Sequence, residues 1–187
     1  VDQITDKATQ WKNQAKDKIN FKYKIFILFS GTGPSNSIFK SAGKVLLAVD
    51  YSGSTGGSGK YWNAVASVLS KIYSERVSFL LWDTNAFPCD YSIMMEFCFH
   101  KQGMGGTDPS CVASYITENF ADEPLTLYLF TDGQVDASSV ERCDSILKNS
   151  NVRFEKVYVH IWNTGGDINL SVSAPFTRSC EFEIYCD

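Results

Sequence analysis

The most constraining feature of the sequence is the alternation, from residue 44 onward, of apolar strand-like segments with amphipathic helical ones. This pattern predicts strands over 44–50, 77–83, 91–100, 125–131, 154–162 and 181–186, and helices over about 58–74, 109–120 and 137–149. Strands that alternate with helices form a mostly parallel sheet covered on both faces, so the fold class is α/β. Only a short turn around 85–88 joins the strands 77–83 and 91–100, which favours an antiparallel pair at one edge of the sheet.

The first 43 residues form a different kind of segment. Residues 3–18 are polar and helix-forming, 21–29 are strand-like, and the Gly- and Ser-rich stretch 30–43 is typical of a loop or boundary. We therefore expect residues 1–43 to be an N-terminal extension of helix plus strand, and residues 44–187 to be the main domain. The chain starts with Val1 rather than Met, and we expect it to be a segment of a larger protein. Whether the strand 21–29 joins the main sheet is left open.

Composition narrows the choice of partners and compartment. With 187 residues and 44% hydrophobic content, the chain is large enough for one packed core. A net charge of −4 and a pI near 5.2 do not provide the broad positive field that attracts nucleic acid, which is therefore not expected as a partner. Apolar runs such as 25–29 are too short to span a membrane. The six cysteines lack zinc-site spacing and are expected to be reduced thiols, which favours a cytoplasmic over an extracellular location.

Oxygen-bearing side chains follow two of the predicted strands. Asp50, Ser52 and Ser54 come at the end of the strand 44–50, and Asp132 comes at the end of the strand 125–131. Thr107 lies in the loop before the helix 109–120. In sheets of this kind, ligands bind beyond the carboxyl ends of the strands, where the strand order reverses. If the two strands are neighbours at that point, these side chains converge on one crevice.

Three short motifs in this chain resemble a known site. In order, spacing and strand context, Asp50-x-Ser52-Gly53-Ser54, Gly106-Thr107 and Thr131-Asp132-Gly133 resemble the metal-ion-dependent adhesion site of von Willebrand factor type A (integrin I-like) domains. The resemblance covers about residues 44–186. It implies a three-layer, Rossmann-like von Willebrand A fold with a mostly parallel sheet, one antiparallel edge strand and helices on both faces.

The resemblance also implies roles for the individual residues. Ser52, Ser54 and Thr107 would supply hydroxyl oxygens to Mg²⁺, or to Mn²⁺ or Ca²⁺, while Asp50 and Asp132 would act mostly through bound waters. Because Mg²⁺ prefers oxygen ligands and hydroxyls add no charge, the ion would keep positive charge toward solvent. An Asp or Glu of a partner protein or neighbouring domain would complete its shell. The implied function is a metal-dependent protein–protein interaction module that is not an enzyme.

The carboxylate of Asp108 has two possible uses. It could reach the ion as an additional ligand, or it could cap the helix that follows. Pro109 directly after it is typical of a first helical position, which favours the capping role.

Two other functions remain as alternatives. The residues of the motifs resemble those of intracellular members of the family, including the domain of Ro-type RNA-binding proteins. This resemblance leaves an RNA-binding adaptor as one alternative. The other is a nucleotide-binding enzyme of P-loop type, because a glycine-rich run from Gly53 to Lys60 follows a strand and opens a helix. Its spacing fails, since Ser54 occupies the position of the first glycine and Tyr61 that of the Mg²⁺-binding hydroxyl.

Overall fold

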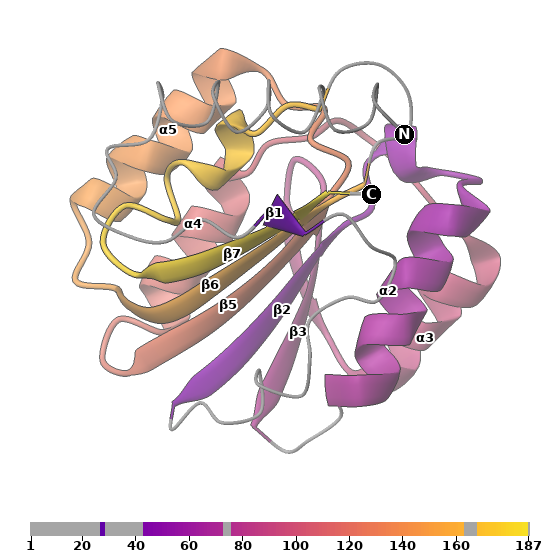
Figure 1. Cartoon of the computed structure of the whole chain (residues 1–187), viewed down its shortest axis with the longest axis horizontal. Coiled ribbons are helices and arrows are strands. Elements are labelled where there is room, and N and C mark those ends of the chain that lie inside the picture. Colours follow the sequence, from indigo (N-terminus) through magenta and orange to yellow (C-terminus); the bar gives the residue numbers. More distant parts are fainter. Residues whose placement is uncertain (1–26, 29–42, 73–75, 163–167, 187) are drawn as a thin grey trace.

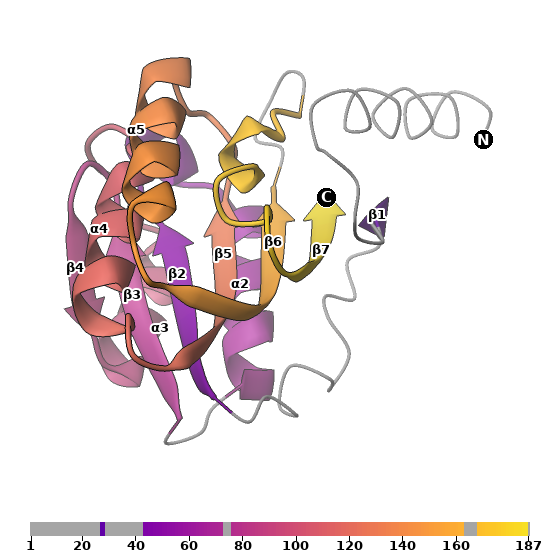
Figure 2. The same cartoon turned by 90° about the vertical axis from the view of Figure 1, so that its left-hand side faces the viewer.

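The computed structural model describes residues 27–28, 43–72, 76–162 and 168–186. Within these residues the strands form one seven-stranded sheet in the order β1-β7-β6-β5-β2-β3-β4 (Figures 1 and 2). The strands are β1 (Ile27–Leu28), β2 (Lys44–Asp50), β3 (Val77–Trp82), β4 (Ala86–Cys89), β5 (Pro124–Thr131), β6 (Arg153–Ile161) and β7 (Glu181–Cys186). The helices are α2 (Gly59–Ile72), α3 (Tyr91–His100), α4 (Ser110–Asn119) and α5 (Ala137–Lys148), with short 3-10 turns η2 (Gly53–Thr55) and η3 (Ser171–Ser173). All neighbouring strands are parallel except β3 and β4.

Helices cover both faces of the sheet, which confirms the predicted three-layer α/β architecture. In Figure 1, α2 and α3 lie on one side of the strands and α4 and α5 on the other. Strand β2 shows why this is required: Leu46 and Ala48 pack in the core under α4 and α5, while Leu47 and Val49 pack under α2 and α3. A strand that is apolar on both faces is stable only between two layers of helices.

The predicted strand 91–100 is wrong, because these residues form helix α3. The Asp90 side chain accepts a hydrogen bond from the Ile93 N–H at 2.9 Å and so caps the helix. Met94 and Cys98, four residues apart, are the buried side chains of this helix, as helical periodicity requires. The antiparallel edge strand exists, but it is the shorter β4, whose Ala86 pairs with Trp82.

At the opposite edge, β1 pairs parallel with β7, with Ile27 opposite Ile184. Part of the predicted strand 21–29 therefore joins the main sheet. The predicted helix or linker over 3–18 lies outside the described residues, and the domain boundary at residue 43 stays a prediction. None of the helices that the structure describes has the length and apolar character needed to cross a membrane.

The strand order reverses between β2 and β5. From β2 the chain passes to β3 and β4 on one side, and it then returns to β5, β6 and β7 on the other. The parallel register sets Val49 opposite Phe130, so Asp50 and Thr131, the last residues of their strands, lie side by side. Ligands of open α/β sheets bind at such a point.

Candidate functional site

Asp50 lies at the carboxyl end of β2, and hydrogen bonds hold both oxygens of its side chain. It is fully buried. Its Oδ1 accepts a hydrogen bond from the Ser52 N–H at 2.8 Å, and its Oδ2 accepts one from the Thr131 hydroxyl at 2.7 Å. The Tyr61 hydroxyl donates to the Asp50 backbone carbonyl and lies 3.4 Å from the carbonyl oxygen of Phe130, so it bridges β2 and β5. Asp50 is therefore held in one orientation.

Asp132 is a second buried carboxylate close to the first. It is 5% exposed, and its Oδ1 accepts a hydrogen bond from the Gln134 N–H at 3.0 Å. Burial and, second to it, repulsion from Asp132 raise the pKa of Asp50 to about 7, although the hydrogen bonds from Ser52 and Thr131 act in the opposite direction. Two buried carboxylates that repel each other are stabilised when a cation binds between them.

The serine hydroxyls provide the neutral oxygens. Ser52 is buried, Ser54 is half-buried, and their Oγ atoms lie 3.2 Å apart. Two adjacent ligands of an octahedral Mg²⁺ ion, each about 2.1 Å from the metal, are separated by about 3 Å. The two hydroxyls therefore have the spacing of neighbouring Mg²⁺ ligands.

Thr107 lies on the same edge of the sheet, in a loop that is bonded to its surroundings on both sides. Before it, the Gly105 carbonyl accepts a hydrogen bond from the Gly53 N–H at 3.1 Å. After it, the Asp108 N–H donates to the Asp83 carbonyl, just beyond β3, at 2.8 Å. Thr107 itself is half-buried. The fold thus brings the turn at Asp132, the loop that contains Thr107 and the loop that contains Ser52 and Ser54 to the carboxyl ends of the central strands.

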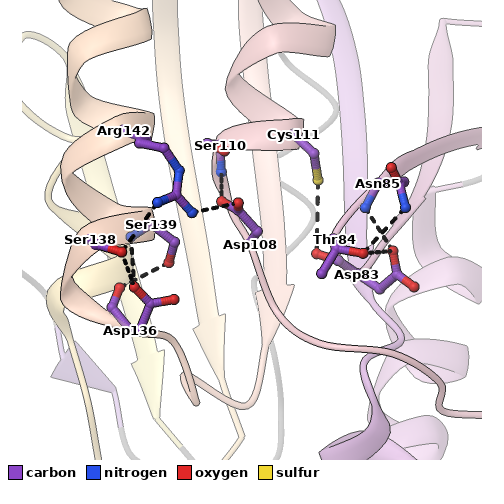
Figure 3. A network of polar contacts seen from close by, with 10 residues as sticks. All are labelled: Asp83, Thr84, Asn85, Asp108, Ser110, Cys111, Asp136, Ser138, Ser139 and Arg142. Atoms are coloured by element: carbon purple, nitrogen blue, oxygen red, sulfur yellow. Dashed lines mark hydrogen bonds and ion pairs between the residues drawn. The ribbon is translucent and has the colours of Figure 1, made fainter.

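The Asp108 carboxylate is engaged by Ser110 and Arg142. Its Oδ1 accepts the Ser110 N–H at 3.0 Å and its Oδ2 pairs with Arg142 at 2.7 Å (Figure 3). Burial raises the pKa of the Asp108 carboxyl, but the hydrogen bonds from Ser110 and Arg142 outweigh it and hold the pKa below its ordinary value. The Asp108 carboxylate therefore accepts the N–H of Ser110, the first residue of α4, but the expected arrangement is corrected in one respect: Pro109 occupies the N-cap and not the first helical position. The same contact ties α4 to α5, where Arg142 also donates to Ser138 at 3.2 Å.

The donor set suits Mg²⁺ better than zinc. Within the described residues, no group of three or more His, Cys, Asp or Glu side chains is placed to hold a metal ion. The oxygens gathered here belong to two carboxylates and to hydroxyls, which is the hard, partly neutral set that Mg²⁺ accepts while it keeps several waters. The residues present thus fit the ion that the motifs predict.

The backbone of the glycine-rich run does not suit a phosphate. Its amides donate to backbone carbonyls: Thr55 to Ser52 at 3.0 Å, Gly56 to Gly53 at 3.2 Å, and Gly57 to Lys101 at 2.9 Å. A phosphate loop needs its amides directed at the ligand. These contacts disfavour nucleotide binding and add to the spacing failure of the motif.

Three residues support the site in roles that were not predicted from the sequence, although Thr131 belongs to the Thr131-Asp132-Gly133 motif. Thr131 orients Asp50, Tyr61 joins the two central strands, and Asp83 holds the turn after β3 by accepting the Asn85 N–H at 2.7 Å. A signal existed only for Thr131, because a polar residue that ends a buried apolar strand needs a partner. The contacts of Tyr61 and Asp83 depend on neighbours that only the folded chain provides.

Comparison with known proteins shows a general similarity of fold and no matching family. No known family matches the sequence, and no curated protein sequence shows a significant match. Among solved structures, the fold is similar to an aerotolerance-related membrane protein from Bacteroides fragilis, with 12% identity, a TM-score of 0.48, and coverage of 78% of this chain and 92% of that one. It is also similar to a mutant of the PilB minor pilin from Streptococcus sanguinis, with 10% identity, a TM-score of 0.45, and coverage of 79% of this chain and 58% of that one. A third similar structure is the SpRpn10 VWA domain, with 10% identity, a TM-score of 0.45, and coverage of 77% of this chain and 88% of that one. At identities and TM-scores this low, membership of the von Willebrand A family stays a prediction that depends on the motifs.

Proposed function

We propose that the protein is an interaction module that binds a divalent cation, Mg²⁺ or Mn²⁺, and through it an acidic side chain of a partner. The single observation behind the proposal is the pair of buried carboxylates, Asp50 and Asp132, placed at adjacent strand ends beside the paired hydroxyls of Ser52 and Ser54. Thr107 would approach the ion from the neighbouring loop. When bound, the ion supplies a positive charge with open coordination positions that a carboxylate oxygen can fill.

The residues of this site would have two different roles in binding the ion. Ser52, Ser54 and Thr107 would hold the ion through neutral oxygens, and Asp50 and Asp132 would bind its water ligands. Thr131 holds the Asp50 carboxylate in place for that role. Because its direct protein ligands would be neutral hydroxyls and the two carboxylates would act through water, the ion would keep positive charge toward solvent and attract an anionic partner. We also propose that the domain catalyses no reaction, because the motifs resemble a binding site and the oxygens that the described residues gather here suit metal binding.

Thermal unfolding with and without metal tests the proposal. We expect Mg²⁺ and Mn²⁺ to raise the melting temperature, since a ligand that binds only the folded state adds roughly 2.7 kcal/mol at a hundredfold excess over its Kd. The double substitution Ser52→Ala and Ser54→Ala is expected to remove this response. Ser70→Ala, in an exposed position of α2, is the matched control and should respond like the parent protein.

Direct titration of the metal distinguishes binding from general salt effects. Calorimetry with Mn²⁺ should give one site in the parent protein and none in the double serine variant. Equal melting curves with and without metal, together with no heat of binding, would rule out the metal-dependent function.

A further inference from the structure

The face of β6 and β7 on the α2 side of the sheet is aromatic and buried. Tyr158 and His160 of β6 and Tyr185 of β7 point to this side, and none of them is more than 3% exposed. The register sets His160 opposite Tyr185, with their rings 5.9 Å apart, and the Tyr185 hydroxyl donates to Glu183 on the same strand. These contacts run along the sheet, so the outer side of each ring is buried only if a further layer covers it.

The described helices do not extend over β7 on this side. Helix α3 contacts β3, and the Tyr61 ring of α2 meets the Phe130 ring of β5 at 5.1 Å. In Figure 2, α2 lies behind β5 and β6, whereas none of the described helices lies behind β7. On the opposite side the layer is complete, because Val172 of η3 packs in the same core as Ile184 of β7. The burial of Tyr185 therefore requires a further segment of chain.

The sequence of residues 3–18 has the pattern of a helix that packs on one side. Its apolar residues recur at i, i+4, i+7 and i+11 and so fall in one stripe of a helix: Ile4, Ala8, Trp11 and Ala15. Lysines border this stripe, and a Lys at such a border covers apolar surface with its stem while its ammonium stays in water. Among the segments outside the described ranges, this one alone has such a stripe in its sequence.

The position of β1 brings this segment to the β6–β7 face. Strand β1 runs parallel to β7, with Ile27 opposite Ile184, so the chain enters β1 from the amino end of β7. A helix that precedes β1 and runs antiparallel to it therefore lies along β7. Residues 3–18 as one helix would extend about 24 Å, and the six residues of β7 extend about 20 Å. The segment thus has the length of the face that it would cover.

We propose that residues 3–18 form a helix that packs antiparallel to β7, with Trp11 over Tyr158 and Tyr185, and that this helix completes the layer on the α2 side. The β6–β7 face is then an interaction surface whose partner is the N-terminal segment of the same chain. Trp11 has the largest apolar area of the stripe and contributes most to the contact. A helix of this length is marginal alone in water, so the sheet is what stabilises it. The inference is independent of the metal-dependent function, because no residue of that site belongs to β6 or β7.

Photo-crosslinking in the full chain locates the segment. The variant Trp11→benzoylphenylalanine reacts on irradiation with the groups that lie against it, and mass spectrometry of tryptic peptides identifies them. We expect adducts within one chain on the peptide after Arg178, which contains β7, and on the peptide after Lys156, which contains most of β6. The matched control is Asn13→benzoylphenylalanine, on the opposite side of the expected helix, and it should give few adducts on either peptide. A mixture of isotope-labelled and unlabelled chains separates adducts within a chain from those between chains.

Hydrogen exchange tests whether the contact holds a helix. In the parent protein, the amides of residues 3–18 should exchange at least about tenfold more slowly than those of an unstructured chain. Trp11→Ser should remove this slowing, because the segment then loses its main contact with the sheet. Asn13→Ser should keep it.

The two measurements decide the inference together. Adducts of position 11 on β6 and β7 of the same chain, with slow exchange that is lost in Trp11→Ser and kept in Asn13→Ser, support it. Exchange of residues 3–18 at the rate of an unstructured chain overturns it. Adducts confined to other elements, or to a second chain, also overturn it, as do equal adducts from positions 11 and 13.

Discussion

Replacement of Asp50 by Asn should make the metal-free protein more stable at neutral pH and, at the same time, abolish its stabilisation by Mg²⁺. Asp50 is fully buried, and burial followed by repulsion from Asp132 raises its pKa from 3.8 to about 7. The folded protein thus binds the Asp50 proton more tightly than the unfolded chain does. The contribution of Asp50 to stability is therefore most favourable below about pH 4 and falls by about 1.4 kcal/mol per pH unit between pH 4 and 7.

The magnitude follows from the size of this pKa shift. Above about pH 7, ionised Asp50 lowers the free energy of unfolding of the metal-free protein by up to about 4 kcal/mol. An Asn side chain has no charge, and its carbonyl can still accept the Ser52 N–H. Its amide group faces the Thr131 hydroxyl, a changed hydrogen bond that costs about 1 kcal/mol. We therefore expect Asp50→Asn to gain about 2–3 kcal/mol at about pH 8 and to lose about 1 kcal/mol at about pH 4, where only the changed hydrogen bond acts.

Urea unfolding without metal, between about pH 4 and pH 8, measures this difference. The parent protein should lose stability relative to Asp50→Asn as the pH rises, and saturating Mg²⁺ should restore the parent protein only. Asp122→Asn, in the exposed turn before β5, is the control and should run parallel to the parent. A destabilised Asp50→Asn at about pH 8, or a pH dependence identical to that of the parent, would refute the account of Asp50 as a destabilised buried carboxylate.

Three further predictions concern the same edge of the sheet. Because metal binding requires Asp50 to be ionised, Mn²⁺ affinity measured by calorimetry should fall by up to tenfold per pH unit below about pH 7, and a flat profile would contradict this role. Gly103→Ala should lower both the melting temperature and the Mn²⁺ affinity, since a Cβ would meet the Gly56 nitrogen at 2.3 Å; unchanged affinity would show that the loop position is unimportant. Arg142→Gln should weaken Mn²⁺ binding with little change in melting temperature, because the Asp108 contact fixes the loop that contains Thr107, and Arg142→Lys should partly restore it.

Helix α3 shows where reasoning from the sequence failed. The run from Tyr91 to His100 is short and rich in aromatic residues, so its composition favours a strand. Periodicity cannot separate a short apolar strand from a helix of this length. The buried pair Met94 and Cys98 identifies the helix only once the neighbouring core is known. The edge position predicted for this run is occupied by β4.

The sequence by itself determined the local features: continuous apolar strands that end in Asp50 and Asp132, amphipathic helices between them, and hydroxyl residues in the loops that follow. These depend on near neighbours in the chain, whose spacing can be recognised directly. Only the tertiary structure decided that β2 lies beside β5, although β3 and β4 separate them in sequence. It likewise decided that Thr131 holds Asp50 and that Arg142 holds Asp108. The reason is that strand order and long-range pairing depend on how both helical layers pack over the whole sheet, and this is a property of the assembled core and not of any one segment.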